Sequence, residues 1–252
     1  MPIEKILITG AAGYLAKFII DRLHTSYQLT LTDIVEPKRN YDGISFFQAD
    51  VTHASEIEAA CVDQDAIVHT VALVRERHGK PNTLFADVMV KGTWNIAEAC
   101  VRQGVQKLVN ISSISACPPA PGVQLPYQVD NPFRFGGGDL NYALAKHLAE
   151  QIGLAYHQAH GLKVIHIRPG VIDGDGMNPG PSIPEKVTEP WFVYVDPRDV
   201  AQCVERAIET EQVNYGAYNA VAGRSDSRYD WKQAEQDLGY SPQHNWEDIP
   251  DS

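Results

Sequence analysis

Short apolar segments alternate with longer amphipathic segments along most of the chain. Apolar segments of this length are typical of strands buried on both faces, and the longer segments are typical of helices that cover them. Strands are expected at residues 5–9, 29–33, 44–48, 66–70, 107–111, 163–167, 191–195 and 215–220, and helices at 14–23, 82–102, 141–160, 199–209 and 230–238. The alternation predicts an α/β fold, a doubly wound parallel sheet that binds ligands at the carboxyl ends of its strands.

The composition argues against several kinds of partner. The 252 residues include 21 Lys and Arg against 32 Asp and Glu, a formal net charge of −11. Nucleic acids and anionic membranes recruit clustered Lys and Arg, so neither is an expected partner. No apolar segment approaches the roughly 18 residues that a membrane span requires. The four cysteines lie far apart without metal-binding or disulfide spacing, so we expect reduced thiols, a cytoplasmic location and no metal.

A glycine-rich segment, TGAAGYLA at residues 9–16, occupies the expected turn between the first strand and the first helix. Gly10 can adopt the backbone angles that such a turn needs, and Gly13 lets a pyrophosphate approach the main chain. The helix that begins near Gly13 offers N–H groups and its positive dipole end to phosphates. Ala16 replaces a third glycine and is small enough for close packing of helix against strand. These features predict a dinucleotide site.

Carboxylates end the second and third expected strands. Asp33 lies about twenty residues after the glycine-rich turn, where it can accept hydrogen bonds from the hydroxyls of an adenosine ribose. It would repel a 2′-phosphate, which favours NAD; Lys38 and Arg39 follow closely and keep NADP as the weaker alternative. Asp50 follows the third strand, and it fits either a contact to adenine or a surface turn without function.

Three further residues indicate proton-transfer chemistry. Tyr142 and Lys146 are four apart on an expected helix, so both side chains share one face. A phenol titrates near pH 10, and a neighbouring ammonium favours the phenolate, which makes Tyr142 a usable general base at neutral pH. Ser113 follows the fifth strand at the same edge of the sheet. Its hydroxyl can hydrogen-bond the oxygen that Tyr142 deprotonates.

In this order the motifs resemble the extended short-chain dehydrogenases/reductases of the NAD-dependent epimerase/dehydratase family. Further similar segments are DAIVHTVA at residues 65–72, KGT with Asn95 at 91–95, RPG at 168–170 and YV through DVA at 194–201. The resemblance implies a Rossmann fold, an NAD-dependent oxidoreductase, and Ser113, Tyr142 and Lys146 as catalytic residues. It implies cofactor contacts from Gly10, Ala12, Gly13, Tyr14, Leu15, Asp33, Asp50, Val51, Val71, Ala72, Tyr142 and Lys146. Met89 stands where the family often has a fourth catalytic residue, Asn.

Within the family, the short length and the C-terminal third resemble the uronate dehydrogenases and their small relatives. The similar segments are WF at 191–192, SRYDW at 227–231 and LGYSP at 238–242. This resemblance implies hydride transfer to NAD from a hydroxyl of a small sugar, sugar acid or related polyol. Expected substrate contacts are Arg75, Ser115, Lys186 and Trp191. Lys186 corresponds to an arginine that grips the carboxylate, and it lacks the bidentate fork of that arginine.

The expected organisation follows from these segments. Residues 1–172 are expected to form the NAD-binding domain, with the sheet completed by about 191–220. A small substrate-binding region would come from 173–190, which is rich in Gly and Pro, and from 221–252. A homodimer through the helices at 82–102 and 141–160 is expected by analogy with the family. Two other functions stay open: a sugar epimerase or dehydratase that retains NAD, and a regulator that senses a dinucleotide without chemistry.

Overall fold

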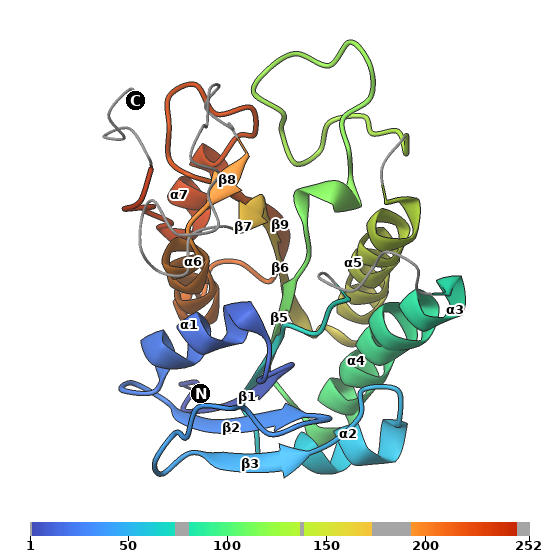
Figure 1. Cartoon of the computed structure of the whole chain (residues 1–252), viewed down its shortest axis with the longest axis vertical. Coiled ribbons are helices and arrows are strands. Elements are labelled where there is room, and N and C mark those ends of the chain that lie inside the picture. Colours follow the sequence, from blue (N-terminus) through green and yellow to red (C-terminus); the bar gives the residue numbers. More distant parts are fainter. Residues whose placement is uncertain (1, 74–80, 137–138, 173–192, 246–252) are drawn as a thin grey trace.

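A seven-stranded parallel sheet forms the centre of the molecule, with the strand order β3-β2-β1-β4-β5-β6-β9 (Figure 1). The computed structural model describes residues 2–73, 81–136, 139–172 and 193–245. The strands of this sheet are β1 Lys5–Thr9, β2 Gln28–Asp33, β3 Ser45–Gln48, β4 Ala66–His69, β5 Lys107–Ile111, β6 Lys163–Pro169 and β9 Tyr215–Ala220. The chain starts in the middle at β1, moves outward to β3, and returns to the other side of β1 as β4. This reversal confirms the doubly wound, Rossmann-like fold.

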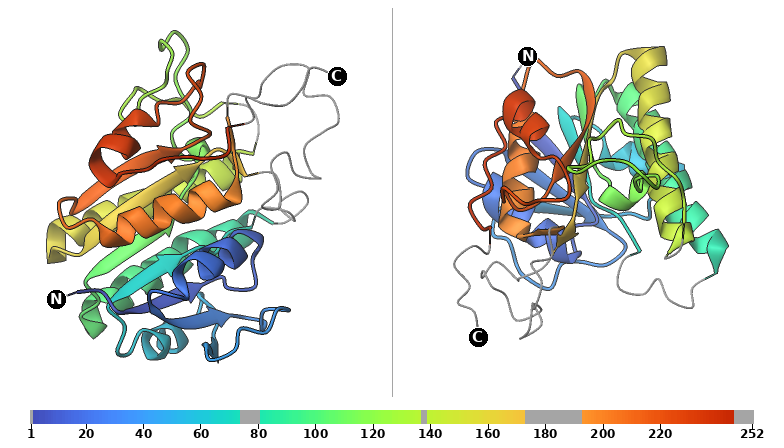
Figure 2. Two further views of the ribbon diagram at one scale, coloured as in Figure 1. Left: turned by 90° about the vertical axis from the view of Figure 1, so that its left-hand side faces the viewer. Right: turned by 90° about the horizontal axis from the view of Figure 1, so that it is seen from above.

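Helices cover both faces of the sheet, as the view from above in Figure 2 shows. They are α1 Tyr14–Leu23, α2 Ala54–Ala60, α3 Asn82–Phe85, α4 Gly92–Gln103, α5 Leu140–His160, α6 Pro197–Glu209 and α7 Lys232–Leu238. Helices α1, α6 and α7 lie on one face, and α2, α4 and α5 lie on the other. The short helix α2 has no counterpart among the elements expected from the sequence.

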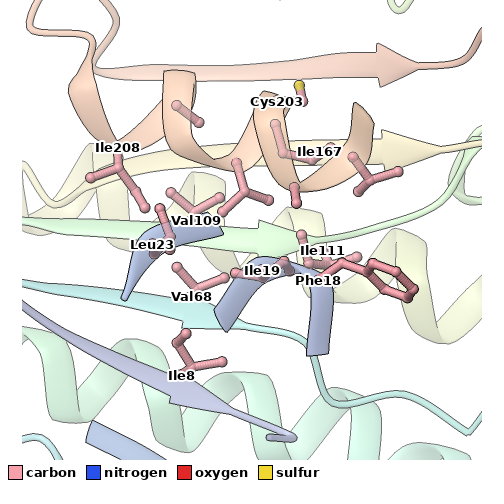
Figure 3. Packing of buried hydrophobic residues seen from close by; sticks show 14 of the residues in the cluster. Ile8, Phe18, Ile19, Leu23, Val68, Val109, Ile111, Ile167, Cys203 and Ile208 are labelled. Atoms are coloured by element: carbon pink, nitrogen blue, oxygen red, sulfur yellow. The ribbon is translucent and has the colours of Figure 1, made fainter. Parts of the chain in front are cut away.

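Successive side chains of the central strand β1 pack into two different hydrophobic cores, one on each face of the sheet. Ile6 and Ile8 of β1 join the cluster under α1 and α6, whereas Leu7 between them joins the cluster under α2 and α4. Figure 3 shows the first cluster, where Val68 and Val109 of the central strands lie beneath the two helices. The strands are therefore continuously apolar because both of their faces are covered, and apolar burial of this kind is the main favourable contribution to folding.

A buried lysine joins the start of β5 to the end of α6. The Lys107 Nζ atom donates hydrogen bonds to the carbonyl oxygens of Ala207, Ile208 and Thr210, at 2.9, 2.7 and 2.6 Å. These carbonyls belong to the last turn of the helix and have no partner within it. Burial, together with the nearby Lys163 charge, lowers the pKa of Lys107 to about 8, and the Glu211 charge opposes this. The Lys107 ammonium thus caps the C-terminal end of α6, at the amino edge of the sheet.

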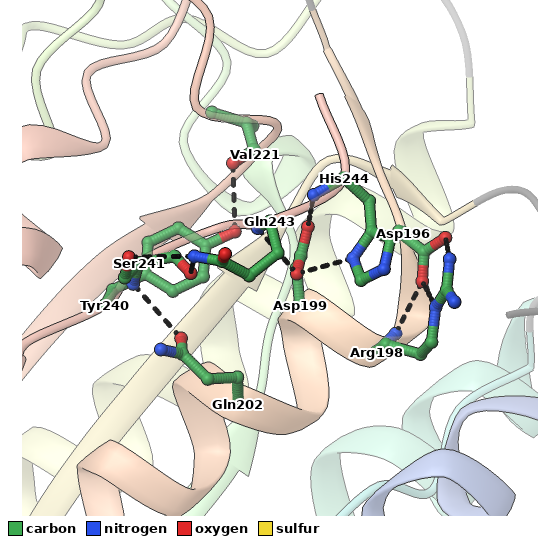
Figure 4. A network of polar contacts seen from close by, with 9 residues as sticks. All are labelled: Asp196, Arg198, Asp199, Gln202, Val221, Tyr240, Ser241, Gln243 and His244. Carbon is green, nitrogen blue, oxygen red and sulfur yellow. Dashed lines mark hydrogen bonds and ion pairs between the residues drawn. The ribbon is translucent and has the colours of Figure 1, made fainter. Parts of the chain in front are cut away.

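The segment that follows α7 is fastened to the first turn of α6 (Figure 4). The Asp199 carboxylate accepts hydrogen bonds from the backbone N–H groups of Gln243 and His244, at 3.0 and 2.9 Å, and lies 2.9 Å from His244 Nδ1. The Tyr240 hydroxyl donates to the carbonyl oxygen of Val221 at 2.9 Å. Residues 240–245 therefore stay close to the strand–helix junction at the carboxyl edge.

The helix expected at 82–102 is continuous but not uniformly α-helical. It begins as α3, continues as a π-helical turn from Ala86 to Lys91, and ends as α4. A π turn holds one residue more than an α turn, so it rotates the residues that follow it around the helix axis. Met89 lies in this turn and is buried with Phe85 and Ala145. Apolar periodicity alone does not reveal such a turn.

The strand expected at 191–195 lies outside the main sheet. Among its described residues, Tyr194–Val195 forms a strand (β8), which pairs with β7 (Val171–Ile172) in a separate two-stranded sheet. Strand β9 takes the place beside β6. The chain before β8 passes so close to Gly170 that a Cβ atom there would lie 1.8 Å from the carbonyl oxygen of Val193, so this pairing requires glycine at position 170. In the described ranges, no helix has the length and apolar character needed to cross a membrane.

Candidate active site

The turn after β1 is as tight as its glycines suggest. Gly10 has a φ of +75°, a conformation that favours glycine. A Cβ atom at Gly10 would lie 2.7 Å from Thr70 Oγ1 and 3.0 Å from the backbone nitrogen of Val71. The Gly13 N–H donates to the carbonyl oxygen of Gly10 at 2.9 Å, and this bond closes the turn. Val71 therefore lies directly against the glycine-rich turn, together with the carboxyl end of β4.

The turn and the end of β2 fit a dinucleotide. Gly13 precedes α1 with extended backbone and no side-chain cap, and the first turn of α1 contains no acidic residue. The positive end of the α1 dipole is therefore not neutralised by its own first turn, which suits a pyrophosphate. The Asp33 carboxylate accepts hydrogen bonds from the N–H groups of Ala12 and Ile34, at 3.0 and 2.7 Å. It is held at the carboxyl edge, where the ribose of NAD would be bound.

Asp50 and Val51 have local structural partners at the next strand end. The Asp50 carboxylate accepts the Thr52 N–H at 2.8 Å. Burial acts to raise the pKa of Asp50, but hydrogen bonds from Thr52 and the charges of His53 and Lys91 outweigh it and lower that pKa. A Cβ atom at Gly92 would lie 2.8 Å from Val51 Cγ2, so Val51 packs directly on the start of α4. The contact of Asp50 with adenine stays a prediction.

Tyr142 and Lys146 share one face of α5, as their spacing predicts. The Lys146 Nζ atom lies 5.9 Å from the centre of the Tyr142 ring and donates a hydrogen bond of 2.5 Å to the carbonyl oxygen of Ile111, the last residue of β5. Lys146 is buried and Tyr142 is half-buried. Burial lowers the pKa of Lys146 to about 8, and the Glu150 charge opposes this. The cation is thus held at the end of the strand that leads to Ser113.

Ser113 begins a short 3₁₀ turn, Ile114–Ala116, directly after β5. Its Oγ atom accepts a hydrogen bond of 3.1 Å from the backbone N–H of Ser115, which fixes the side chain at the carboxyl edge. The expected serine, tyrosine and lysine therefore come from β5 and α5 to one end of the sheet. Their catalytic roles stay predictions.

A hollow of about 230 Å³ lies beside Tyr142. Three distant segments form its wall. Its lining residues are Ile114, Ser115, Pro118, Phe135, Gly136, Asp139, Leu140, Tyr142, Ala143 and Tyr229. Tyr229 comes from beyond β9, and its ring packs edge-on against Tyr127 with 5.3 Å between the ring centres. Of the expected substrate contacts, Ser115 lines this hollow, whereas Arg75, Lys186 and Trp191 lie outside the described residues.

A buried histidine at the end of β4 has a place in the site that the sequence did not suggest. His69 Nδ1 lies 2.7 Å from the Thr9 hydroxyl, and its Nε2 lies 3.3 Å from the Thr93 hydroxyl. Burial, with the nearby Lys146 charge, lowers the pKa of His69 to about 3, so the ring is neutral at physiological pH. It connects the strand before the glycine-rich turn to α4. Only its position in the segment DAIVHTVA could have pointed to it.

Other expected features of the site are also located. Tyr14 packs edge-on against Phe18, with 5.5 Å between ring centres, and Leu15 lies against the core beneath α1. Ala72 packs against the apolar cluster that contains Met89. No three His, Cys, Asp or Glu side chains in the described parts of the chain form a group that could hold a metal ion.

Known proteins resemble the chain along nearly its whole length. It is 28% identical to the uncharacterized protein YtbQ of Bacillus subtilis, over 96% of this chain and 95% of that protein. It is 25% identical to an NAD-dependent glucose-6-phosphate dehydrogenase of Haloferax volcanii, over 96% of this chain and 94% of that one. The fold matches a uronate dehydrogenase from Agrobacterium tumefaciens with a TM-score of 0.80 at 20% identity, over 100% of this chain and 92% of that chain.

The family itself is shown by a match that spans most of the fold. The model of the NAD-dependent epimerase/dehydratase family aligns with residues 6–221, from β1 to the residue after β9. The family is NAD-dependent and its members are enzymes of the short-chain dehydrogenase/reductase type, so the expected cofactor and the expected kind of protein are confirmed. The chain therefore belongs to the NAD-dependent epimerase/dehydratase family.

Proposed function

We propose that the chain oxidises a hydroxyl group of a small sugar, sugar acid or related polyol. The observation that carries the proposal is the grouping at the end of β5. There the Lys146 ammonium is bound to the Ile111 carbonyl oxygen and lies 5.9 Å from the Tyr142 ring. Ser113 follows two residues later. A glucose-6-phosphate dehydrogenase and an L-arabinose 1-dehydrogenase of Haloferax volcanii are among the relatives, which supports a sugar as substrate.

Each of the three residues has one task in this proposal. NAD, when bound, would supply the hydride acceptor for the substrate carbon. Tyr142 accepts the proton of the substrate hydroxyl on its phenolate oxygen. The Lys146 ammonium favours that phenolate. Ser113 donates a hydrogen bond to the substrate oxygen and keeps it within reach of Tyr142.

The substrate-binding region is proposed to come from residues 173–190 and 221–252. Tyr229, in the second of these segments, lines the hollow beside Tyr142, which supports the division. The hydroxyls of Ser115 and Tyr229 and the ring of Phe135 suit a small polyol, which offers both hydroxyl groups and C–H faces. Lys186 and Arg75 are proposed to supply the positive charge for a sugar acid, and Trp191 a further contact.

The decisive experiment measures NADH formation over a panel of aldoses, uronic acids and polyols, with Tyr142→Phe beside the unaltered chain. Turnover should be lost in Tyr142→Phe while NAD binding, followed by fluorescence, stays unchanged. Tyr156→Phe is the matched control, because Tyr156 lies on the same helix and its hydroxyl bonds Glu98 at 2.7 Å, away from the hollow. An unaltered rate in Tyr142→Phe would rule out the proposed roles. Tightly bound NAD with no release of NADH would favour an epimerase instead.

We also propose a homodimer through α4 and α5. Trp94, Leu140, Leu144 and Leu148 on these helices are between 39% and 57% exposed. Exposed apolar residues grouped on two packed helices are costly unless a partner covers them. Helix α5 makes contacts with α3, α4 and the π-helical turn, so α4 and α5 together form one outer layer.

The four cysteines are unpaired in the structure, which agrees with the proposed cytoplasmic location.

A further inference from the structure

A buried carboxylate lies on the same face of α5 as the two proposed catalytic residues. Glu150 is one helical turn beyond Lys146 and two turns beyond Tyr142. Its Oε1 atom accepts hydrogen bonds from the Ser112 hydroxyl at 2.5 Å and from Arg168 Nε at 2.8 Å. Its Oε2 atom accepts one from Arg168 Nη2 at 2.7 Å. The carboxylate thus joins α5 to Ser112, which follows β5, and to Arg168 near the end of β6.

Arg168 extends this network to the wall of the hollow. Its Nη1 atom donates to the carbonyl oxygen of Val129 at 2.8 Å, and its Nη2 atom donates to Cys117 Sγ at 3.3 Å. Val129 and Cys117 belong to the segment that also contributes Pro118 and Phe135 to the hollow. One buried ion pair therefore holds the strand that leads to Ser113 and the loop that surrounds the proposed substrate position.

The Glu150 charge also bears on Lys146. Burial acts to raise the pKa of Glu150, but the hydrogen bond and charge of Arg168, with the hydrogen bond of Ser112, outweigh it, so the carboxyl group is ionised. Burial lowers the pKa of Lys146, and Glu150 is the charged group of the described chain that opposes this.

Three other groups face this part of the site from neighbouring elements. His69 on β4 and His166 on β6 are both buried, and burial lowers their pKa values to about 3 and about 4. They are therefore neutral near pH 7 and add no positive charge beside Lys146. Arg168 on β6 is bound to Glu150 itself, and Tyr142 lies on the same helix as Lys146.

We propose that Glu150 is a positioning residue for the dehydrogenase reaction: it fixes Ser112, and with it the neighbouring Ser113 hydroxyl, and it places a negative charge one helical turn from Lys146. The proposal rests on the function proposed above for Ser113, Tyr142 and Lys146. Glu150 acts through these residues and through Arg168, and its role differs from that of a buried ion pair that only stabilises the fold.

The test compares Glu150→Gln, the double variant Glu150→Gln/Arg168→Gln and the unaltered chain. Glu150→Gln alone leaves the buried Arg168 guanidinium without its counter-charge and could prevent folding. The double variant removes that charge as well, so it is more apt to fold. The titration of the Lys146 side chain is followed by NMR in chains with ¹⁵N-labelled lysine, with Lys146→Arg to assign the signal. Loss of a nearby opposite charge should lower the titration midpoint by about one pH unit in Glu150→Gln. The decrease should be smaller in the double variant, because loss of the Arg168 cation acts in the opposite direction. Glu98→Gln, an exposed carboxylate on α4, is the control and should leave the midpoint unchanged.

Activity gives a second, separable readout. The alkaline limb of the pH profile of kcat/KM should move to lower pH in the Glu150 variants, by the same shift as the NMR midpoint. Ser112→Ala keeps the Glu150–Arg168 pair, so it should lower kcat without moving that limb. A Lys146 midpoint that decreases in neither variant would overturn the proposal, even if stability is lost. If no substrate is oxidised at all, the proposed function fails, while the NMR titration still decides the role of Glu150.

Discussion

The Asp33 carboxylate at the end of β2 accepts a hydrogen bond of 3.0 Å from the backbone N–H of Ala12, in the turn that follows β1. Two strand ends of the cofactor site are thus joined directly. The same carboxylate is the group proposed to bind the adenosine ribose. Its place relative to the turn is therefore set by the fold, so that less ordering is needed when a dinucleotide binds.

Asp33→Asn separates the charge of this residue from its hydrogen bond. The amide oxygen can still accept the Ala12 N–H, but it no longer repels a 2′-phosphate and accepts ribose hydroxyls more weakly. We expect the KM for NAD to rise about tenfold and the preference for NAD over NADP to fall by at least that factor. Initial rates with both cofactors measure this. A ratio equal to that of the unaltered chain would remove Asp33 from cofactor selection.

Gly10→Ala tests the tight contact between the turn and β4. The new Cβ would meet Thr70 Oγ1 at 2.7 Å in a residue that already has a positive φ. Gly43→Ala is the matched control, because Gly43 has a φ of +78° but nothing within 4 Å of its Cβ. Gly43→Ala should cost about 1 kcal/mol of unfolding free energy, and Gly10→Ala clearly more, together with loss of NAD binding. Equal costs in urea unfolding would contradict the contact.

Acid should destabilise the fold through its buried histidines. In the unfolded chain, histidine titrates near pH 6.5, whereas burial lowers the pKa of His69 to about 3 and of His166 to about 4. Between these values the unfolded state binds protons that the folded state does not, so stability is present above pH 6.5 and falls as the pH decreases. Each histidine should contribute up to about 1.4 kcal/mol per pH unit.

Urea unfolding between pH 7 and pH 4.5 checks this slope. His69→Gln should make the decrease shallower by the contribution of one histidine, although stability at pH 7 is also expected to fall. His160→Gln replaces an exposed histidine at the end of α5 and should leave the slope as it was. A His69→Gln slope as steep as that of the unaltered chain would show that His69 is accessible to protons.

The exposed leucines of α5 test the proposed dimer. Leu144→Glu and Leu148→Glu together place two charges on the outer layer and should convert a dimer to a monomer in sedimentation experiments, without a change in circular dichroism. Phe47→Glu on the edge strand β3 introduces a charge at a similarly exposed apolar position and should leave the dimer intact. A monomer before any substitution would exclude this assembly.

Local patterns predicted the parts of the site that depend on one segment. Gly10 and Gly13 are read from a strand–helix turn, and Tyr142 and Lys146 from the spacing of one helix. The Asp33 position follows from the end of a single strand. In each case the residue type, the spacing and the element suffice, because the geometry is set within a few residues.

The remaining parts depend on neighbours that are distant in sequence. His69 is held by Thr9 and Thr93, and Glu150 by Ser112 and Arg168, so their roles appear only when four strands are placed side by side. The π-helical turn around Met89 and the separate pairing of β8 with β7 likewise depend on packing. Sequence periodicity does not predict these contacts between distant segments.

Strand β5 has a lysine bound at each of its ends: Lys107 ties its beginning to the carbonyls that end α6, and Lys146 binds the carbonyl oxygen of its final residue. The strand is therefore clamped between the two edges of the sheet, and Ser112 and Ser113 follow directly. The last turn of α6 therefore helps to fix the same five-residue strand that leads to the proposed catalytic serine. We expect substitutions at that opposite edge to change the position of Ser113, although they touch neither the proposed cofactor site nor the hollow.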